Sequence, residues 1–314
     1  MTERRKILMV LTSSRLDCFQ LCMDMLLKGG SAQRFDQVAL LLNGVVGAHR
    51  RYVDRMLSEH PEVAWELIEG PRGRGWFISN LQNECVKRHP GALYFKIDED
   101  VFVSRDWDLR LEETYRAHKA EGNLSLVSAT VPNNGLGAWS LLKRFEADRE
   151  AFLRQEKAVF EAIASGCVWF YPHLGEWMTR RYLDLDAAER RARESGTERW
   201  ERWGDRFSIN CICYDWEHWQ ELGGVREHDE VDWGAWIREN RKLVVFDTHA
   251  ICHHYCFFNQ QDWLDRTSLL EDVRESNLGE RVGRLTRGWR RMCRMGRQIP
   301  SVLRRRLERT GGAK

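Results

Sequence analysis

Two aspartates, Asp98 and Asp100, stand at the end of an apolar run in YFKIDEDVF, residues 94–102. An ionised carboxylate taken out of water is costly unless it has a partner. Residues two apart on a strand point the same way, so the pair can converge on a hard divalent cation such as Mg2+ or Mn2+, with positions left open for phosphate oxygens. The alternative is an exposed acidic turn with no ligand. The apolar strand before the pair favours the metal site.

A second acidic cluster, Asp229, Glu230 and Asp232, precedes the helical segment WGAWIREN at 233–240. Acids are favoured in the first turn of a helix by its dipole, so capping is one interpretation. The other is that one of these carboxylates is a catalytic base at the mouth of the crevice that holds the aspartates. The residues alone leave both interpretations open.

Two consecutive histidines, His253 and His254, end the last apolar run, KLVVFDTHAICHHY at 242–255. Most histidines are structural, and neighbours on a strand face opposite ways. At most one of the two is therefore expected to bind a ligand.

The elements that must position these residues follow from hydrophobic patterning. The sequence predicts strands at 6–13, 35–44, 63–70, 92–98, 124–131, 207–214 and 242–255, with helices at 19–30, 49–60, 76–90, 107–120 and 216–222. Strands that alternate with helices predict an α/β fold with a mostly parallel sheet covered on both faces. Ligands of such sheets bind at the carboxyl ends of the strands, which is where Asp98 and Asp100 stand.

The stretch 140–205 has a different character, because charged helical segments with Glu and Arg at supportive spacing dominate it. We expect a helical insertion, and a candidate acceptor region, within one domain at 1–270. The remaining residues, 271–314, form a separate tail.

Size and composition indicate a compact protein, with 314 residues, 43% hydrophobic residues and 6 prolines. The apolar run 7–11 is too short for a signal peptide, and no run approaches the roughly 20 apolar residues of a spanning helix, so we expect a cytoplasmic protein. The nine cysteines are scattered, which is typical of reduced thiols. A zinc site is a less favoured alternative, built from Cys211, Cys213, Cys252, Cys256 and the histidine pair.

The tail is electrostatically distinct, because residues 281–309 hold eleven arginines and one acid. Apolar side chains follow a helical stripe through it at Val282, Leu285, Trp289, Met292, Ile299 and Leu303. A basic amphipathic segment predicts peripheral binding to an anionic membrane, here on its inner face. A solvated tail, or one docked on the acidic body of its own chain, are the alternatives. The body of the chain is acidic and contains no recognised nucleic-acid-binding module, which argues against nucleic acid as a partner.

The order of these features resembles a GT-A fold glycosyltransferase, closest to family 2 nucleotide-sugar transferases. The likeness rests on TSSR after the first strand, LLLNG, ISNLQNE, YFKIDEDVF, WEHWQELGGV running into DEVDW, and AICHHY. It spans residues 6–256 and leaves 140–205 unmatched. The resemblance implies a nucleotide-diphospho-sugar transferase fold of Rossmann-like type.

The resemblance also implies roles for individual residues. Asp98 and Asp100 match the metal and diphosphate motif, and a late histidine, His253 rather than His254 by strand position, completes the metal site. The nucleotide would lie around a set that also includes Asp98, namely Thr12, Arg15, Asn43 and Asn80. Family members often carry Asp-Gly or Asp-Asn where this chain has Asn43-Gly44, and their base motif differs from DEVD. The base therefore stays open between Glu230 and Asp232.

The expected function is metal-dependent transfer of a sugar from a nucleoside-diphosphate sugar to an acceptor hydroxyl, with inversion, in envelope polysaccharide or glycolipid synthesis. A divalent cation would neutralise the leaving diphosphate, and a carboxylate would take the acceptor proton. The acceptor would be a sugar, a lipid-linked group or a protein. Two alternatives are a sugar-phosphate nucleotidyltransferase, although no Gly-rich phosphate loop is evident, and a non-catalytic nucleotide-sugar binding module.

Overall fold

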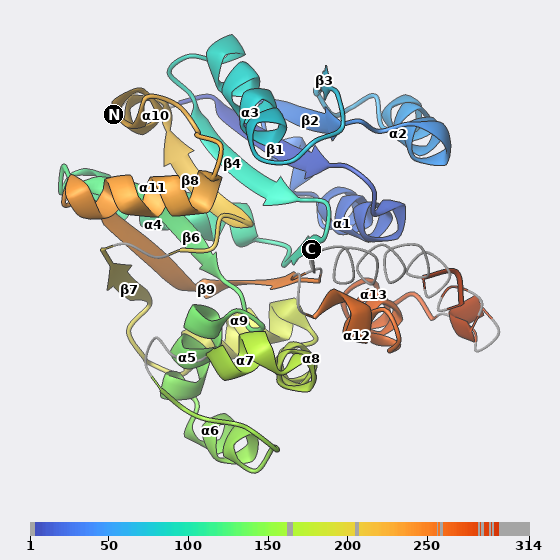
Figure 1. The fold of residues 1–314 in the computed structure, drawn as a ribbon, viewed down its shortest axis with the longest axis vertical. Helices are drawn as coiled ribbons and strands as arrows, with labels where there is room; N and C mark the ends of the chain where they lie inside the picture. Colours follow the sequence, from blue (N-terminus) through green and yellow to red (C-terminus); the bar gives the residue numbers. More distant parts are fainter. Residues whose placement is uncertain are drawn as a thin grey trace, which may run out of the picture.

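The fold is that of a computed structural model, which describes residues 4–161, 166–204, 207–255, 257, 260–281, 283, 286–288, 290 and 292–294. A central sheet carries helices on both faces (Figure 1). In the described part of the chain the sheet has nine strands, along the path β3 (Trp65–Gly70), β2 (Gln37–Asn43), β1 (Lys6–Thr12), β4 (Leu93–Asp98), β8 (Cys211–Asp215), β6 (Leu124–Thr130), β9 (Leu243–His254) and β5 (Val101–Val103), with β7 (Trp200–Trp203) on β9.

The first half of the sheet confirms the prediction from patterning. Strands β3, β2, β1 and β4 are mutually parallel. Their side chains are almost all buried along β1, β2 and β4, which explains why the runs read as nearly unbroken apolar segments.

The second half of the sheet is mixed. Strand β8 is antiparallel to both β4 and β6, while β6 and β9 are parallel to each other. The short strands β5 and β7 are antiparallel to β9 and were not predicted. Three or four residues give too short a pattern for periodicity to distinguish a strand from a loop.

Two hydrophobic clusters cover the two faces of the sheet. On one face pack α1 (Leu16–Lys28), α2 (Gly47–Glu59) and α4 (Trp107–Lys119), which meet β1 at Leu8 and Val10. On the other pack α3 (Trp76–Arg88), α10 (Trp216–Leu222) and α11 (Asp229–Glu239), which meet β1 at Ile7 and Met9. Alternate residues of a buried strand thus serve opposite cores.

The helical stretch after β6 consists of α5 (Gly135–Arg144), α6 (Glu146–Leu153), α7 (Gly166–Phe170), α8 (Pro172–Arg181) and α9 (Leu185–Glu194). The helices gather beyond the β6 and β9 edge of the sheet (Figure 1). The buried carboxylate of Asp148 joins three of them, because it accepts hydrogen bonds from Arg181, Tyr182 and Arg191. Residues 200–203 of the expected insertion return to the sheet as β7.

The chain continues through α12 (Gln261–Leu264) and α13 (Leu269–Leu278). Two arginines of the tail pair with acids of α13: Arg287 with Asp272 at 2.7 Å, and Arg294 with Glu271 at 2.7 Å. Arg294 and Glu271 are both only 2% exposed. Both acids lie within the segment 271–314 itself, and Arg294 also donates to the carbonyls of Asp265 and Thr267 in the body of the chain.

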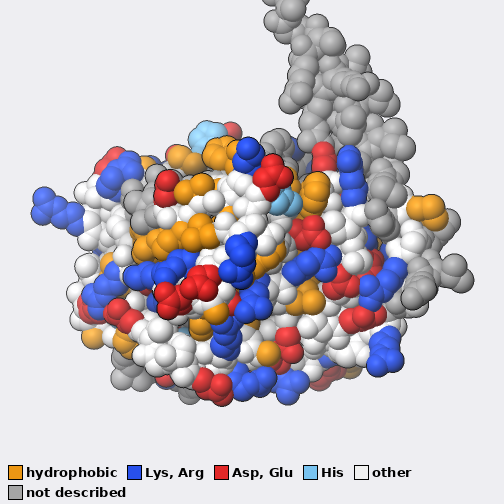
Figure 2. Space-filling view, turned by 90° about the horizontal axis from the view of Figure 1, so that it is seen from below, with side chains coloured by type: hydrophobic (Ala, Val, Ile, Leu, Met, Phe, Trp, Pro, Cys, Tyr) orange, Lys and Arg blue, Asp and Glu red, His pale blue; other side chains and the backbone are white. Residues whose placement is uncertain are grey.

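The apolar stripe expected in the tail lies mostly outside the described residues. Met292 is described and is exposed. In the described part of the chain, every helix is too short or too polar to cross a membrane. On the face seen in Figure 2, basic and acidic side chains are interspersed rather than gathered by sign.

Helix α9 is fixed to the sheet by the buried carboxyl of Glu189. Its Oε1 accepts hydrogen bonds from the Ser104 hydroxyl and from the Ile251 amide, the latter at 3.1 Å. Burial raises the pKa of Glu189 from 4.5 to about 8. Between these values the folded chain holds a proton that the unfolded chain releases, so the free energy of unfolding falls as the pH rises.

We expect Glu189→Gln to remove this pH dependence, because the amide keeps the acceptor and cannot ionise. Between pH 5 and pH 8 the melting temperature of the variant should rise relative to wild type by about 3 °C, measured by circular dichroism. Glu194→Gln, at an exposed position on the same helix, is the control and should follow wild type. Parallel curves for Glu189→Gln and wild type would contradict the assignment.

Candidate functional site

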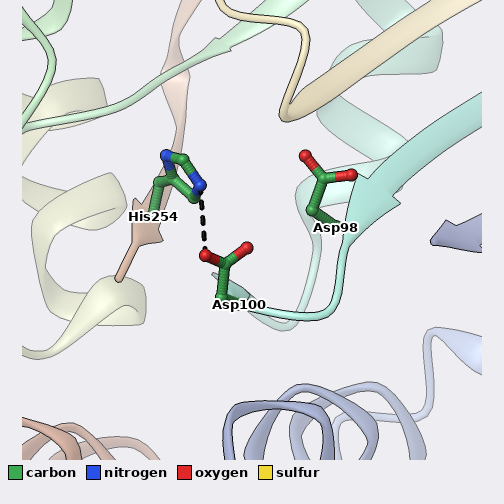
Figure 3. A group of neighbouring side chains, drawn as sticks. All are labelled: Asp98, Asp100 and His254. Carbon is green, nitrogen blue, oxygen red and sulfur yellow. Dashed lines mark ion pairs between the residues drawn. The ribbon is translucent and has the colours of Figure 1, made fainter. Parts of the chain in front are cut away.

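Asp98, Asp100 and His254 converge on one point (Figure 3). One ligand atom from each lies within 4.8 Å of the others, and His254 Nε2 is 3.3 Å from Asp100 Oδ2. Asp100 and His254 are buried, and Asp98 is partly exposed. The predicted convergence of the two aspartates is therefore what the structure shows.

Backbone pairing brings the three residues together. Asp98 ends β4, and Asp100 follows in the turn that leads into β5. Strand β5 pairs with β9 so that Val101 lies opposite His254, and the Tyr255 amide donates to the Asp100 carbonyl at 2.9 Å. Pairing of β9 with the three-residue strand β5 thus places His254 beside the aspartates.

The sequence-based choice of His253 is wrong in this geometry, and His254 takes its place. The His253 side chain points to the other side of β9, where Nε2 lies 3.5 Å from the Leu183 carbonyl. Burial lowers the pKa of His253 to about 4, so it is neutral. The register between β6 and β9 shifts where Thr130 pairs with Ile251, which changes the alternation that strand counting assumes.

The three side chains fit a divalent cation. Ligand atoms bound to one ion at roughly 2.0–2.6 Å cannot be more than about 5 Å apart, and this set meets that limit. Two carboxylates and one imidazole leave other coordination positions open. A mixed oxygen and nitrogen set suits Mn2+ better than Mg2+, which prefers oxygen ligands.

Lys96 was not singled out in the sequence, yet it lies against the site. Its side chain is 1% exposed, and its ammonium lies 2.7 Å from Asp98 Oδ1 and donates to the Ile209 carbonyl at 3.1 Å. The signal was available, because a lysine inside an apolar strand needs a buried partner. Burial raises the pKa of Asp98, and the Lys96 charge opposes that shift.

Glu99, between the two aspartates, points away from them into the loop after β1. Its carboxylate accepts the Thr12 hydroxyl at 2.7 Å and the amides of residues 13, 14 and 15 at 3.0–3.1 Å. Burial raises the pKa of Glu99, and these hydrogen bonds oppose the rise. Thr12 is fully buried, so its expected side-chain contact with a nucleotide gives way to a role in shaping the loop.

The acidic residues at the start of α11 have two different roles. Asp232 accepts the His228 amide at 3.1 Å and thereby caps the helix. Glu230 instead accepts the Ile209 amide and lies within electrostatic range of Lys96 and His254. Burial raises the pKa of Glu230 to about 7.

The remaining predicted nucleotide residues lie at different depths. Asn43 is buried and ties the end of β2 to the loop after β3 through both the carbonyl and the amide of Gly73, each at 2.9 Å. Arg15 lies over the Tyr255 ring and pairs with Asp265 at 2.8 Å. Asn80 is exposed on α3. Only Arg15 of these three is tied to the segment next to His254.

The architecture is similar to that of two solved structures. A mannosyltransferase from Pyrobaculum calidifontis, in complex with GDP-Man and Mn2+, matches with a TM-score of 0.52 and 13% identity over 95% of this chain and 71% of that chain. GalNAc-T7, with UDP, GalNAc and Mn2+, matches with a TM-score of 0.52 and 10% identity over 82% of this chain and 44% of that chain. The chain has the GT-A fold. No family model matches the sequence, and neither does any curated protein.

Within this GT-A fold, side chains beyond the ligands hold the site in shape. The Asn133 amide donates to the His254 carbonyl at 2.6 Å and to Gln260 at 2.9 Å. Gln260 is fully buried and donates in turn to Asn133 and to Val168 of α7. These hydrogen bonds link the helices after β6 to the backbone of His254.

The GT-A site depends on the loop that Glu99 holds. We expect Glu99→Ala to lower the free energy of unfolding by about 3 kcal/mol, because several buried donors lose a charged acceptor. Urea denaturation followed by circular dichroism measures the change. Glu59→Ala, at an exposed i,i+4 pair on α2, is the control and should cost under about 1 kcal/mol. Equal effects of the two substitutions would contradict this role.

Proposed function

We propose that the chain is a metal-dependent glycosyltransferase that moves a sugar from a nucleoside-diphosphate sugar to an acceptor hydroxyl. The convergence of Asp98, Asp100 and His254 at the end of β4 carries the proposal. The fold supports it, because both similar structures contain Mn2+ with a nucleotide or a nucleotide-sugar. The cofactor would be Mn2+ or Mg2+.

The chemistry requires charge neutralisation at the leaving group. When the anomeric carbon leaves its diphosphate, negative charge builds on the phosphate oxygens, and a bound divalent cation acts there as a Lewis acid. Asp98, Asp100 and His254 would hold that ion. Arg15 and the loop at 12–15 would border the nucleotide, together with Asn43 and Asn80 at the next strand ends.

Glu230 is the proposed catalytic base. A carboxylate that takes the proton of the acceptor hydroxyl works best when its pKa lies near the working pH, and the pKa of Glu230 is about 7. Asp232 is engaged in helix capping, which favours Glu230 over it. Attack by a deprotonated acceptor from the face opposite the diphosphate would invert the anomeric centre.

The acceptor side is proposed for the helices after β6. These helices reach the site through Gln260 and Asn133. Exposed aromatic side chains, Phe170 and Tyr171 on this region and Trp263 on α12, could stack on sugar rings. A sugar, lipid-linked or protein acceptor, and a role in envelope polysaccharide or glycolipid synthesis in the cytoplasm, belong to this proposal.

Activity should depend on Asp100 and on the metal. With Mn2+ and a panel of GDP- and UDP-sugars, we expect release of GDP or UDP to fall at least about 100-fold in Asp100→Asn, because one metal ligand loses its charge. Asp54→Asn, at an exposed position on α2, is the matched control. Nucleotide release that persists in EDTA, or in Asp100→Asn, would contradict the proposal.

The two alternative functions give different products in the same assay. A nucleotidyltransferase would release pyrophosphate from a nucleoside triphosphate and a sugar phosphate. A binding module would show Mn2+-dependent thermal stabilisation by a nucleotide-sugar without turnover.

The pH profile tests the base. We expect kcat of the wild type to rise through about pH 7 and then level, because the base acts only when ionised. Glu230→Gln should lower kcat by about 10^2 to 10^4 and abolish this rise. Asp232→Asn should keep the profile. The reverse pattern, with the pH dependence lost only in Asp232→Asn, would assign the base to Asp232.

A further inference from the structure

A buried lysine stands at the centre of the proposed site and has no place in the mechanism above. Lys96 lies two residues before Asp98 on β4, so both side chains extend from the same side of the strand. The lysine is 1% exposed, whereas the Asp98 side chain is 19% exposed. The ammonium thus reaches Asp98 from the interior of the protein.

Both aspartates of the site have a nitrogen-bearing partner inside the protein. Lys96 pairs with Asp98 at 2.7 Å, and His254 pairs with Asp100 at 3.3 Å. Asp98 therefore has an internal cation as its partner, and Asp100 has an imidazole. Taking a lone ammonium or carboxylate out of water is costly, so the Lys96 and Asp98 pair stabilises both members when no metal is present.

A divalent ion and Lys96 compete for the same carboxylate. An ion bound by Asp98 and Asp100 would stand close to the ammonium, and like charges a few ångströms apart repel strongly in a partly buried site. We propose that Lys96 is the internal counter-ion of the metal site: it neutralises Asp98 in the metal-free chain, must give up this pair when the ion binds, and so sets the metal affinity.

The same lysine connects the metal site with Glu230. Lys96 donates to the Ile209 carbonyl at 3.1 Å, and the Ile209 amide donates to the Glu230 carboxylate. The backbone carbonyl and amide of Ile209 thus lie between Lys96 and the proposed base. An ammonium released from Asp98 keeps this carbonyl as its hydrogen-bond acceptor. The link to the base rests on the proposed function, whereas the competition for Asp98 does not.

Mn2+ titration without any nucleotide-sugar tests the inference. Free Mn2+ is measured by electron paramagnetic resonance in wild type, Lys96→Met and Lys96→Arg. We expect Lys96→Met to bind Mn2+ at least about tenfold more tightly, because the competing charge is gone. Lys96→Arg keeps the charge and should remain near wild type. Mn2+ should also raise the melting temperature of Lys96→Met more than that of wild type.

A second lysine and aspartate pair, in which the aspartate is buried, provides the matched control. Lys119 pairs with Asp215, which lies opposite Leu93 at the start of β4, at the other end of the strand from Asp98. Lys119→Met should destabilise the chain with no change in Mn2+ affinity. Unchanged or weaker Mn2+ binding by Lys96→Met would overturn the inference.

A structural measurement covers the case in which Lys96→Met does not fold. In a crystal structure of the wild-type chain with Mn2+ bound, the Lys96 ammonium should have left Asp98 Oδ1. An ammonium still within about 3 Å of that atom would overturn the inference. If wild type binds no Mn2+ at all, the proposed function and the inference both fail. If Mn2+ binds and Asp100→Asn abolishes binding while Lys96→Met has no effect, only the inference fails.

Discussion

The hydrogen bonds of the Glu99 carboxylate are the interaction on which the site depends. Three consecutive acids end β4, and they separate because the middle one turns into the protein and accepts four hydrogen bonds from the loop after β1. With Glu99 fixed on one side, Asp98 and Asp100 are directed to the other. The buried carboxylate of Glu99 therefore shapes both the loop between β1 and α1 and the metal site.

The first half of the fold could be predicted from the sequence because each buried strand is an apolar run of six or seven residues followed by a helical pattern. Strands β1, β2 and β4 and the placement of Asp98 and Asp100 at a strand end follow from that. The direction of β8 could not be predicted, since an apolar run such as CICYD has no orientation in its pattern. The strands β5 and β7 are too short to show periodicity.

The histidine shows why local alternation is not enough. The choice between His253 and His254 depends on the phase of β9, and that phase is altered where the strand slips against β6 near Thr130. No single-strand pattern contains the position of such a slip, because it is set by packing against a distant element. Lys96 is a different case, since its isolation in an apolar strand was visible and only its partner was not.

The aspartates and the histidine of the site come from distant parts of the chain. Asp98 and Asp100 belong to the N-terminal half of the sheet, whereas His254 arrives on β9, roughly 150 residues later, after a long stretch of helices. Pairing over such a separation must close a long loop, and the entropy of loop closure opposes it. A nascent or partly folded chain would hold both carboxylates but no imidazole. Complete coordination would then be a property of the finished protein alone, and premature capture of a metal ion would be weak.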